Sequence, residues 1–463
     1  MTVLQCANDI KYVQYLSTII ASLGAASMGT SFSWSSPSIP MLTSSDSPIG
    51  VQLTHEQASW VASCFPLGMI PGSILAGVSL SKIGHKNIFF CCSVLFLTSW
   101  ILVTVSNSLT LLVTGRIIGG LAGGAQISIL QLYVGEIADK NIRGKLAVFP
   151  TANAQVGLLI GLGIGPFVSF QAYSIICAVI ALVYGVTVLF IPQSPYFLMK
   201  KDKEQDAQKS LQMLIATLRT KNKNEASLQE IRSTIEYQTK NKFTIKKLLV
   251  ERRYRNSLLM VIVIKTLSDF SGGYAINSYV QTVLDESNSS LSPEVASLIY
   301  GVIQVVSIFS SAFLIDKVGR KPLSIVSSGG AALALISEGV YFYLKDVKHI
   351  DTNDFNFLPV LALCIYRLMV SLSLSSLPYV LVSELFSVDA KEMCALIFGT
   401  YSSILMFTNI KIFNPILEAA GFHTLFWIFS ASCILAIVFV AVLLPETKGI
   451  SFNAIQDKLD SKK

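Results

Sequence analysis

The sequence predicts an all-α membrane protein of about twelve transmembrane helices, built as two related halves of about six helices each. Three observations support this fold class. Of the 463 residues, 52% are hydrophobic and 14% are charged, whereas soluble proteins carry about 25% charged residues. Apolar runs of about 20 residues, long enough to cross a hydrocarbon core ~30 Å thick, recur along the whole chain. Short polar motifs of the first half return, in the same order, in the second half.

The apolar runs are expected to be helices, because lipid offers no partner to an open backbone N–H or C=O group. The mean hydropathy of the chain is +0.60. The first run is too long for a signal peptide and lacks a convincing cleavage site, so we interpret it as a span. The predicted spans are 13–35, 56–80, 87–106, 109–134, 146–170, 172–192, 257–284, 294–316, 322–344, 357–383, 392–418 and 422–444.

Lys and Arg residues gather in the loops of one side of the predicted bundle. These basic loops hold Lys82, Lys86, Lys140, Arg143, Lys145, a dense cluster in 200–255, Lys317, Arg320 and Lys321. The loops of the other side hold only Lys345 and Lys348. This asymmetry predicts that both termini lie in the cytosol. The membrane expected for this integral protein is the plasma membrane. The net charge of +7 then reflects orientation, and no nucleic-acid partner is expected, because no groove-reading element accompanies it.

One polar segment, 200–256, interrupts the hydrophobic pattern. Its apolar residues fall on one helical face in two stretches, which are Leu211, Leu214, Ile215 and Leu218, then Leu228, Ile231 and Ile235. We predict short amphipathic helices packed beneath the membrane domain on the cytosolic side. A disordered charged linker is the alternative. The expected domains are 1–199 and 257–450 for the two halves, 200–256 for the cytosolic helical linker and 451–463 for a cytosolic tail.

Three motifs repeat at offsets of 235 to 253 residues. The pairs are Gly77–Lys86 with Ala312–Lys321, Glu136 and Arg143 with Glu384 and Lys391, and Pro192-Gln-Ser-Pro195 with Pro445-Glu-Thr-Lys448. Three motifs in matching order indicate a duplicated unit. This architecture is typical of secondary transporters, in which two halves rock about a site near the bilayer midplane.

The motifs resemble those of the sugar porter family of the major facilitator superfamily, most of all insect facilitated sugar and trehalose transporters. The resemblance extends over essentially the whole chain. Its most specific pieces are Gly115-Arg116-Ile-Ile-Gly119, Tyr133-x-x-Glu136-Ile-Ala138 with Arg143-Gly144, Pro192-Gln-Ser-Pro195, Asp316-Lys-Val-Gly-Arg-Lys321 and Pro445-Glu-Thr-Lys-Gly449. It implies the major facilitator fold and sugar transport by alternating access, with no enzymatic activity and no cofactor.

The charged residues of these motifs are candidates for a conformational latch. Carboxylate–guanidinium pairs at cytosolic helix ends can form when the inner side closes and break when it opens. The candidates, all expected at cytosolic helix ends, are Arg116, Glu136, Arg143, Asp316, Arg320, Glu384 and Lys391. Ser81 and His85 stand where the family has Asp and Arg, so the first-half latch should be the weaker one. The alternative is that these charges only set topology and anchor the helix ends.

The resemblance also implies that amides and indoles of helices 5, 7, 8, 10 and 11 hold the sugar. An amide offers both donors and an acceptor to a polyol. Most of the family's contacts are replaced here: Ser268-Asp269-Phe-Ser-Gly-Gly-Tyr274 stands for Gln-Gln-x-Ser-Gly-x-Asn, Thr151 for Gln, Gln304 for Asn, Ser375–Tyr379 for Gly-Pro-x-Pro-Trp and Ser402-Ser403 for Asn-Trp. The candidate substrate contacts are Thr151, Ser268, Asp269, Tyr274, Asn277, Gln304 and Tyr379.

Four ionisable residues inside predicted spans stand out, namely Lys265, Asp269, Glu338 and Arg367. Each needs a partner or a watery cavity, because a charge within the membrane is costly. Lys265 and Asp269 are four residues apart and can pair on one helical face. Asp269 then either faces the cavity, touching substrate or carrying a proton, or belongs to a static pair that fixes helix packing. Glu338 and Arg367 lie at comparable depth and can also pair.

Three functions remain open at this stage. The leading hypothesis is a facilitative transporter of a hexose or trehalose. A proton-coupled symporter using Asp269 is the second, although the span from Ile19 to Ser36 lacks the acid usual in such symporters. A non-transporting sensor or degenerate paralogue is the third. The eight cysteines show no metal-ligand spacing, and Asn288-Ser-Ser290 is a glycosylation sequon in a loop expected outside. The expected partners are a small sugar and the bilayer, and the oligomeric state stays open.

Overall fold

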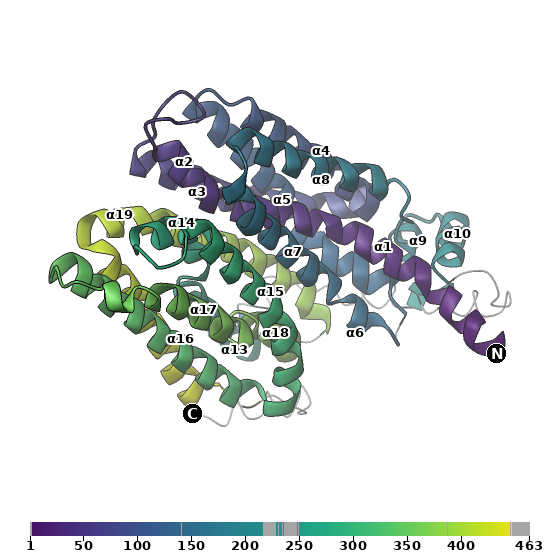
Figure 1. Cartoon of the computed structure of the whole chain (residues 1–463). Helices are drawn as coiled ribbons and strands as arrows, with labels where there is room; N and C mark the ends of the chain where they lie inside the picture. Colours follow the sequence, from purple (N-terminus) through teal and green to yellow (C-terminus); the bar gives the residue numbers. More distant parts are fainter. Residues whose placement is uncertain are drawn as a thin grey trace.

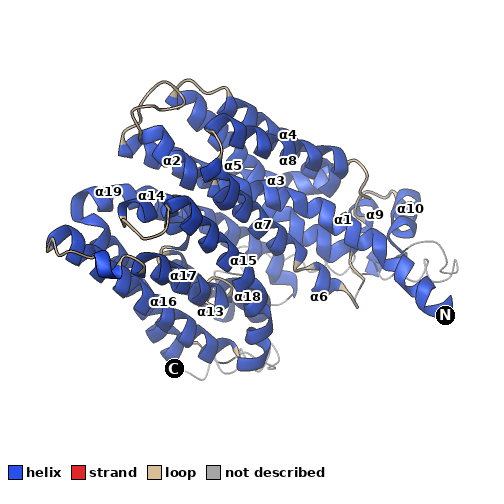
Figure 2. Cartoon of the chain, viewed as in Figure 1, coloured by secondary structure: helices blue, strands red, loops and turns tan. Residues whose placement is uncertain are grey.

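The chain folds into helices joined by short loops, and the described residues contain no strand (Figure 2). The computed structural model describes residues 2–139, 141–215, 228–229, 231–233, 235, 248, 250–386, 388–444 and 446. Within helices, a few side chains are also left undescribed, including those of Asp316 and Lys391.

The first half contains seven α-helices longer than one turn and two short elements. They are α1 (Thr2–Ser33), α2 (Ser35–Thr43), α3 (His55–Ile83), α4 (His85–Thr104), α5 (Leu109–Ile137), α6 (Arg143–Leu146), α7 (Phe149–Ile164), η1 (Gly165–Phe167) and α8 (Phe170–Val188). Serine and threonine side chains begin several of them. Thr54 Oγ1 accepts a hydrogen bond from Gln57 N at 3.2 Å, and Gln57 Oε1 accepts one from Thr54 N at 3.0 Å, which forms a capping box at the start of α3.

The linker and the second half follow. Their elements are α9 (Pro195–Lys200), α10 (Glu204–Ile215), α13 (Arg252–Asp269), α14 (Gly273–Glu286), α15 (Pro293–Val318), α16 (Arg320–Phe342), η2 (Tyr343–Val347), η3 (Asn353–Phe355), α17 (Leu358–Leu372), α18 (Leu377–Leu385) and α19 (Val388–Val442). Buried hydrophobic side chains form two large clusters, one drawn mainly from α1–α8 and the other mainly from α13–α19.

The predicted all-helical membrane fold is confirmed. Nine segments of the described residues are long and apolar enough to cross a membrane. One of them, Met393–Val442, holds two crossings, because its backbone turns at Gly421, where φ is 75°. With α1 and α15 the described helices give the twelve predicted crossings.

Two helices predicted to be continuous are broken. The span expected over 257–284 is split into α13 and α14 at Gly272, whose φ of 94° lies in the left-handed region that favours glycine. The span expected over 357–383 is split into α17 and α18 across Ser373–Ser376. The two breaks contact each other, since Ser268 Oγ donates to Leu374 O at 2.8 Å. Broken helices of this kind line the substrate sites of many transporters.

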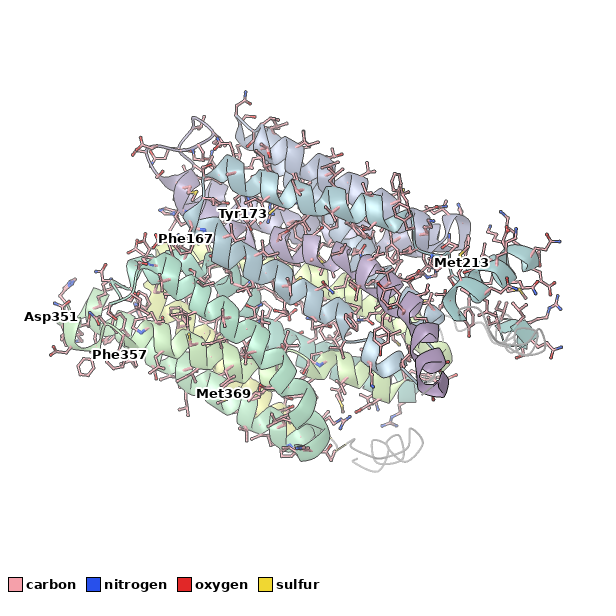
Figure 3. The ribbon with its side chains drawn as sticks, turned by 45° about the vertical axis from the view of Figure 1, so that its right-hand side comes forward. Phe167, Tyr173, Met213, Asp351, Phe357 and Met369 are labelled. Atoms are coloured by element: carbon pink, nitrogen blue, oxygen red, sulfur yellow. The ribbon has the colours of Figure 1, made fainter. Side chains whose placement is uncertain are left out.

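The two halves lie side by side, with α1–α8 in the upper part of Figure 1 and α13–α19 in the lower part. The end that carries α2 and the turn of α19 is called here the α2 end, and the end that carries α9 and α10 the α10 end. Figure 3 shows Met213 of α10 far from Asp351 and Phe357, which belong to the α2 end. At the α10 end, Gln14 of α1 donates to Leu214 O at 3.2 Å and accepts from Asp139 N at 2.9 Å.

The linker is described only in part. Leu211, Leu214, Leu228 and Ile231 of the predicted apolar faces are buried, and Ile235 is half-buried. Leu198, Ala207, Leu211 and Leu228 form a small apolar cluster around α9 and α10. Leu218 lies outside the described residues, as does the side chain of Ile215.

Candidate functional site

A buried ion pair stands at the break between α13 and α14. Lys265 Nζ lies 2.9 Å from Asp269 Oδ1, and the two residues are 1% and 3% exposed. The same ammonium lies 3.5 Å from Tyr379 Oη and 5.5 Å from the ring centre of Tyr274. Either charge left at this depth without the other would be strongly destabilising, so each side chain stabilises its partner. The second carboxylate oxygen, Asp269 Oδ2, has no hydrogen-bond partner among the described residues.

Aromatic rings surround this pair on the second half. The Lys265 ammonium is 5.1 Å from the ring centre of Tyr379 and 5.7 Å from that of Phe398. Tyr379 packs edge-on against Phe398 at 5.1 Å and remains 44% exposed. Tyr274 faces Phe32 of α1 at 6.2 Å, across the boundary between the halves. The structure therefore brings Asp269, Tyr274 and Tyr379 together around Lys265.

A second polar contact joins the halves through two amides. Gln304 of α15 donates through Nε2 to Gln155 Oε1 of α7 at 2.7 Å. Gln304 is 1% exposed, and its Oε1 has no partner within the described part of the chain. Gln155 was not predicted. It lies one turn after the predicted Thr151, which is exposed, and this spacing on one helical face is the sequence signal that could have indicated it.

The other predicted substrate residues lie nearby but are engaged differently. The Ser268 hydroxyl is occupied by Leu374 O, so it ties two broken helices together. Asn277 is 7% exposed, and its Oδ1 has no described partner. Asn409 of α19, also unpredicted, is fully buried and accepts a hydrogen bond from Ala275 N at 3.1 Å, which satisfies a free N–H group at the start of α14.

The first-half latch candidates meet at the α10 end. His85 Nδ1 lies 3.6 Å from Glu136 Oε2, and the same carboxylate oxygen accepts a hydrogen bond from Ser194 Oγ. The neighbouring Gln193 accepts from Lys86 N at 3.0 Å. The Pro192-Gln-Ser-Pro195 motif therefore holds the start of α4 and the end of α5 together.

The second-half candidates make the corresponding contacts with full charges. Arg320 places Nη2 3.0 Å and Nε 3.1 Å from Glu384 Oε1. Glu446 accepts from Arg320 N and from Lys321 N, each at 3.0 Å. The side chains of Asp316 and Lys391 lie outside the described part of the chain, so their expected roles stay predictions.

Two latch candidates do not make the contacts expected of them. Arg116 lies on α5 about 30 Å before Glu136, at the ~1.5 Å rise per residue of an α-helix. It is therefore at the α2 end, where it is 2% exposed and donates to Ser31 O at 2.8 Å and Ser35 Oγ at 3.1 Å. Its expected place in the latch was wrong, because the sequence motif gives no depth along the helix. The Arg143 side chain is exposed and forms no ion pair with Glu136 in the structure as described.

The expected pairing of Glu338 with Arg367 is also absent from the described contacts. Glu338 of α16 is 1% exposed, and neither of its carboxylate oxygens has a hydrogen-bond partner among the described residues. Arg367 of α17 is half-buried and forms no ion pair with it there. Comparable depth on neighbouring helices does not bring two side chains to the same face.

Comparison with known proteins identifies the family. The family described as "Sugar (and other) transporter" matches residues 16–459. The chain is 28% identical to the facilitated trehalose transporter Tret1 of Bombyx mori over 97% of this chain and 87% of that protein. It is 27% identical to the Tret1 of Polypedilum vanderplanki, over 97% of this chain and 88% of that one.

The fold has a close structural counterpart. The structure is similar to that of the xylose transporter XylE from E. coli in a partially occluded inward-open conformation, with a TM-score of 0.79 at 20% identity over 95% of this chain and 100% of that one. At this identity the likeness shows the major facilitator fold. Because the family match spans nearly the whole sequence, the chain belongs to the sugar (and other) transporter family of the major facilitator superfamily, and it is a sugar transporter rather than an enzyme.

Proposed function

We propose that this protein moves a small neutral sugar, a hexose or trehalose, across a membrane by alternating access and without proton coupling. The observation that carries the proposal is the set of polar atoms left without partners between the halves. Gln304 Oε1 and Asp269 Oδ2 are buried acceptors with no described partner. A sugar hydroxyl donates to such acceptors, and its own oxygen accepts from an amide N–H group.

A neutral solute fits the charges of the candidate site. The ammonium of Lys265 is neutralised by Asp269 at 2.9 Å, so it offers no spare positive charge to a phosphate or carboxylate. The exposed face of Tyr379 suits the apolar C–H face of a sugar ring. These features favour a polyol over an anion. We include Thr151, Asn277 and Gln155 as further sugar contacts. Ser268, which bonds Leu374 O, is proposed to stabilise the break between α13 and α14.

The ion pair also favours uniport over proton symport. A proton carrier must take up and release its proton during each cycle, and here Asp269 Oδ1 is already occupied by the Lys265 ammonium at 2.9 Å. The alternative, proton-coupled transport through Asp269, rests on the free Oδ2 atom. We assign the two halves, 1–199 and 257–450, as the rocking units and Glu136, Arg320 and Glu384 as latch residues.

Uptake by purified protein in liposomes tests the proposal. We expect saturable, gradient-driven entry of labelled glucose or trehalose that a proton uncoupler leaves unchanged. Stimulation by an imposed proton gradient would favour the symporter instead. Correctly folded protein that neither binds nor moves any common mono- or disaccharide would remove the sugar assignment and favour a non-transporting paralogue.

Orientation forms part of the same proposal, with both termini in the cytosol of a plasma-membrane protein. Asn288 of the Asn288-Ser-Ser290 sequon is exposed, at the α2 end between α14 and α15. If that end is extracellular, protein from a secretory pathway carries a glycan there, and Asn288→Gln abolishes the mobility shift given by glycosidase. A cysteine at 288 should react with an impermeant maleimide added outside intact cells. Reaction from the cytosolic side alone would reverse the orientation.

A further inference from the structure

Lys411 is an ionisable residue within a membrane-spanning segment of α19 that the site described above does not use. A lysine at such a position needs a partner, because its charge is costly in a low-dielectric environment. Its Nζ donates to Ser59 Oγ of α3 at 2.7 Å and lies 4.3 Å from the ring centre of Trp60. Among the described residues no carboxylate lies within ion-pair distance of it. Both stabilising partners therefore belong to the other half of the protein.

The surroundings orient these partners toward Lys411. Ser59 is fully buried and donates its own hydroxyl hydrogen to Glu56 O at 3.0 Å, which leaves its oxygen free to accept from the ammonium. Trp60 packs against Phe407 of α19 at 6.2 Å, which holds the indole beside the lysine. An ammonium over the face of a tryptophan is a favourable cation–π arrangement, and Lys411 is half-buried beside it.

The same edge continues toward the end of the bundle. Asn414, one turn beyond Lys411, is 4% exposed and donates to His55 O at 2.8 Å. On the neighbouring pair of elements, Gln281 N of α14 donates to Ser36 Oγ of α2 at 3.2 Å. The described polar contacts between the halves other than the Gln155–Gln304 bond thus lie at the α2 end. Near the α10 end the same two helices, α3 and α19, meet through Gly77 and an apolar residue, Leu396.

We propose that Lys411, Ser59 and Trp60 form a gate that holds the α2 end closed and opens in each transport cycle. Separation of α3 from α19 at this end removes the hydroxyl and the ring from the ammonium at the same time. The positive charge of Lys411 therefore biases the protein toward the packing in which this end is shut. The proposal rests on alternating access by the two halves but not on which sugar is carried.

The gate is tested by the accessibility of a reporter cysteine in protein reconstituted into nanodiscs, where reagent reaches both ends. Gln281→Cys places a thiol at a half-buried position whose backbone N–H group bonds Ser36 Oγ, and Ser290→Cys in the exposed loop serves as the normaliser. The reaction of the native cysteines is measured in each protein without the reporter cysteine and is subtracted from the labelling of the corresponding reporter protein. We expect Lys411→Met to raise the labelling rate of Gln281→Cys at least threefold, while Lys411→Arg, which keeps the charge, leaves it near the parent rate.

A matched substitution separates loss of charge from general damage to α19. Thr408→Met lies one turn before Lys411, and its hydroxyl bonds only its own helix at Ile404 O. It should leave labelling unchanged. Trp60→Leu should act like Lys411→Met, and the double variant should label no faster than either single variant if ring and ammonium form one unit. Equal labelling in Lys411→Met and the parent, or an equal rise in Thr408→Met, overturns the gate. Melting temperatures show that each variant is folded.

Transport readouts distinguish this inference from the proposed function. If the parent moves sugar, Lys411→Met should change turnover while equilibrium binding of sugar changes less than twofold. If the parent moves no sugar, the sugar assignment fails, yet the labelling still reports whether the α2 end opens. Loss of sugar binding in Lys411→Met with unchanged labelling would assign Lys411 to the substrate site and would overturn its role as a gate.

Discussion

The first and second halves contain the same glycine turn between two helices, but different side chains stabilise it. Gly84 and Gly319, with φ of 78° and 102°, separate corresponding helices. The lysines that follow, Lys86 and Lys321, donate through Nζ to Leu189 O at 2.7 Å and Ala441 O at 2.6 Å. The backbone geometry of the duplicated unit is therefore kept on both sides.

The side chains that accept hydrogen bonds from the backbone N–H groups after these turns differ. In the first half the neutral Gln193 accepts one hydrogen bond from Lys86 N. In the second half the charged Glu446 accepts two, from Arg320 N and Lys321 N. Charge-assisted hydrogen bonds are about twice as strong as neutral ones. The acids Glu136 and Glu384 follow the same rule, since Glu384 pairs with an arginine at 3.0 Å and Glu136 lies beside a histidine at 3.6 Å.

The contrast extends to the helices that begin each half. Several hydroxyls of α1 bond their own helix, such as Ser22 Oγ, which donates to Thr18 O at 2.6 Å. On α13 the corresponding region holds the Lys265–Asp269 ion pair. The described Lys–Asp and Arg–Glu pairs of the two halves thus lie in the second half, whereas the corresponding contacts of the first half are mainly neutral hydrogen bonds. Substitutions that remove or add charge should therefore act more strongly in the second half.

The largest effect is expected from breaking the buried ion pair. Asp269→Leu leaves Lys265 as an orphaned charge and should destabilise the protein by about 3–5 kcal/mol, because a buried charge without its partner is strongly unfavourable. Folded yield and melting temperature measure this loss. The double variant Lys265→Met/Asp269→Leu should recover most of the yield. Recovered folding with lost transport would show that the pair takes part in the cycle and is more than a packing element.

The next effect is expected at the latch. Glu384→Ala removes a carboxylate partner of Arg320, a half-buried contact of about 1.5–3 kcal/mol, and should slow turnover roughly tenfold or more while sugar binding changes little. Glu136→Ala, its first-half counterpart, should slow turnover less. Single-turnover uptake and equilibrium binding, measured on the same preparations, compare the two. Equal losses in the two variants would contradict the contrast between the halves.

A smaller effect is expected at the Gln155–Gln304 hydrogen bond, which joins the two halves. Gln155→Leu and Gln304→Ala each remove one amide of the pair and should weaken sugar binding by about 1–3 kcal/mol if those amides bond a sugar hydroxyl in a dry site. The control is Asn153→Leu, an amide on the same helix that bonds only Phe149 O of its own helix. Affinity loss in the control equal to that in Gln155→Leu would assign the effect to α7 as a whole.

The sequence predicted the local features better than the long-range ones. The Lys265–Asp269 pair followed from spacing on one helix, which needs no knowledge of the fold. The Gln155–Gln304 bond and the Lys411 contacts join helices far apart in the chain, so no spacing rule reveals them. Lys411 was also hidden by the strongly apolar average of its span, Met393–Val442. Arg116 was misplaced because its motif was read without its depth along α5.

The smallest effect is expected from adding charge to the first half. His85 is 2% exposed and lies 3.6 Å from Glu136, where its counterpart Arg320 forms a direct ion pair with Glu384. His85→Arg should let a guanidinium reach Glu136 and add about 0.5–1.5 kcal/mol of stability to that end, a typical net gain for a hydrogen bond. The melting temperature should rise by a few degrees, and turnover should fall by less than tenfold as the latch opens more slowly. His85→Gln, which adds no charge, is the control. A fall in melting temperature in the arginine variant alone would show that the first half cannot accommodate the charge, and that its neutral chemistry is required by the space around α4 and α5.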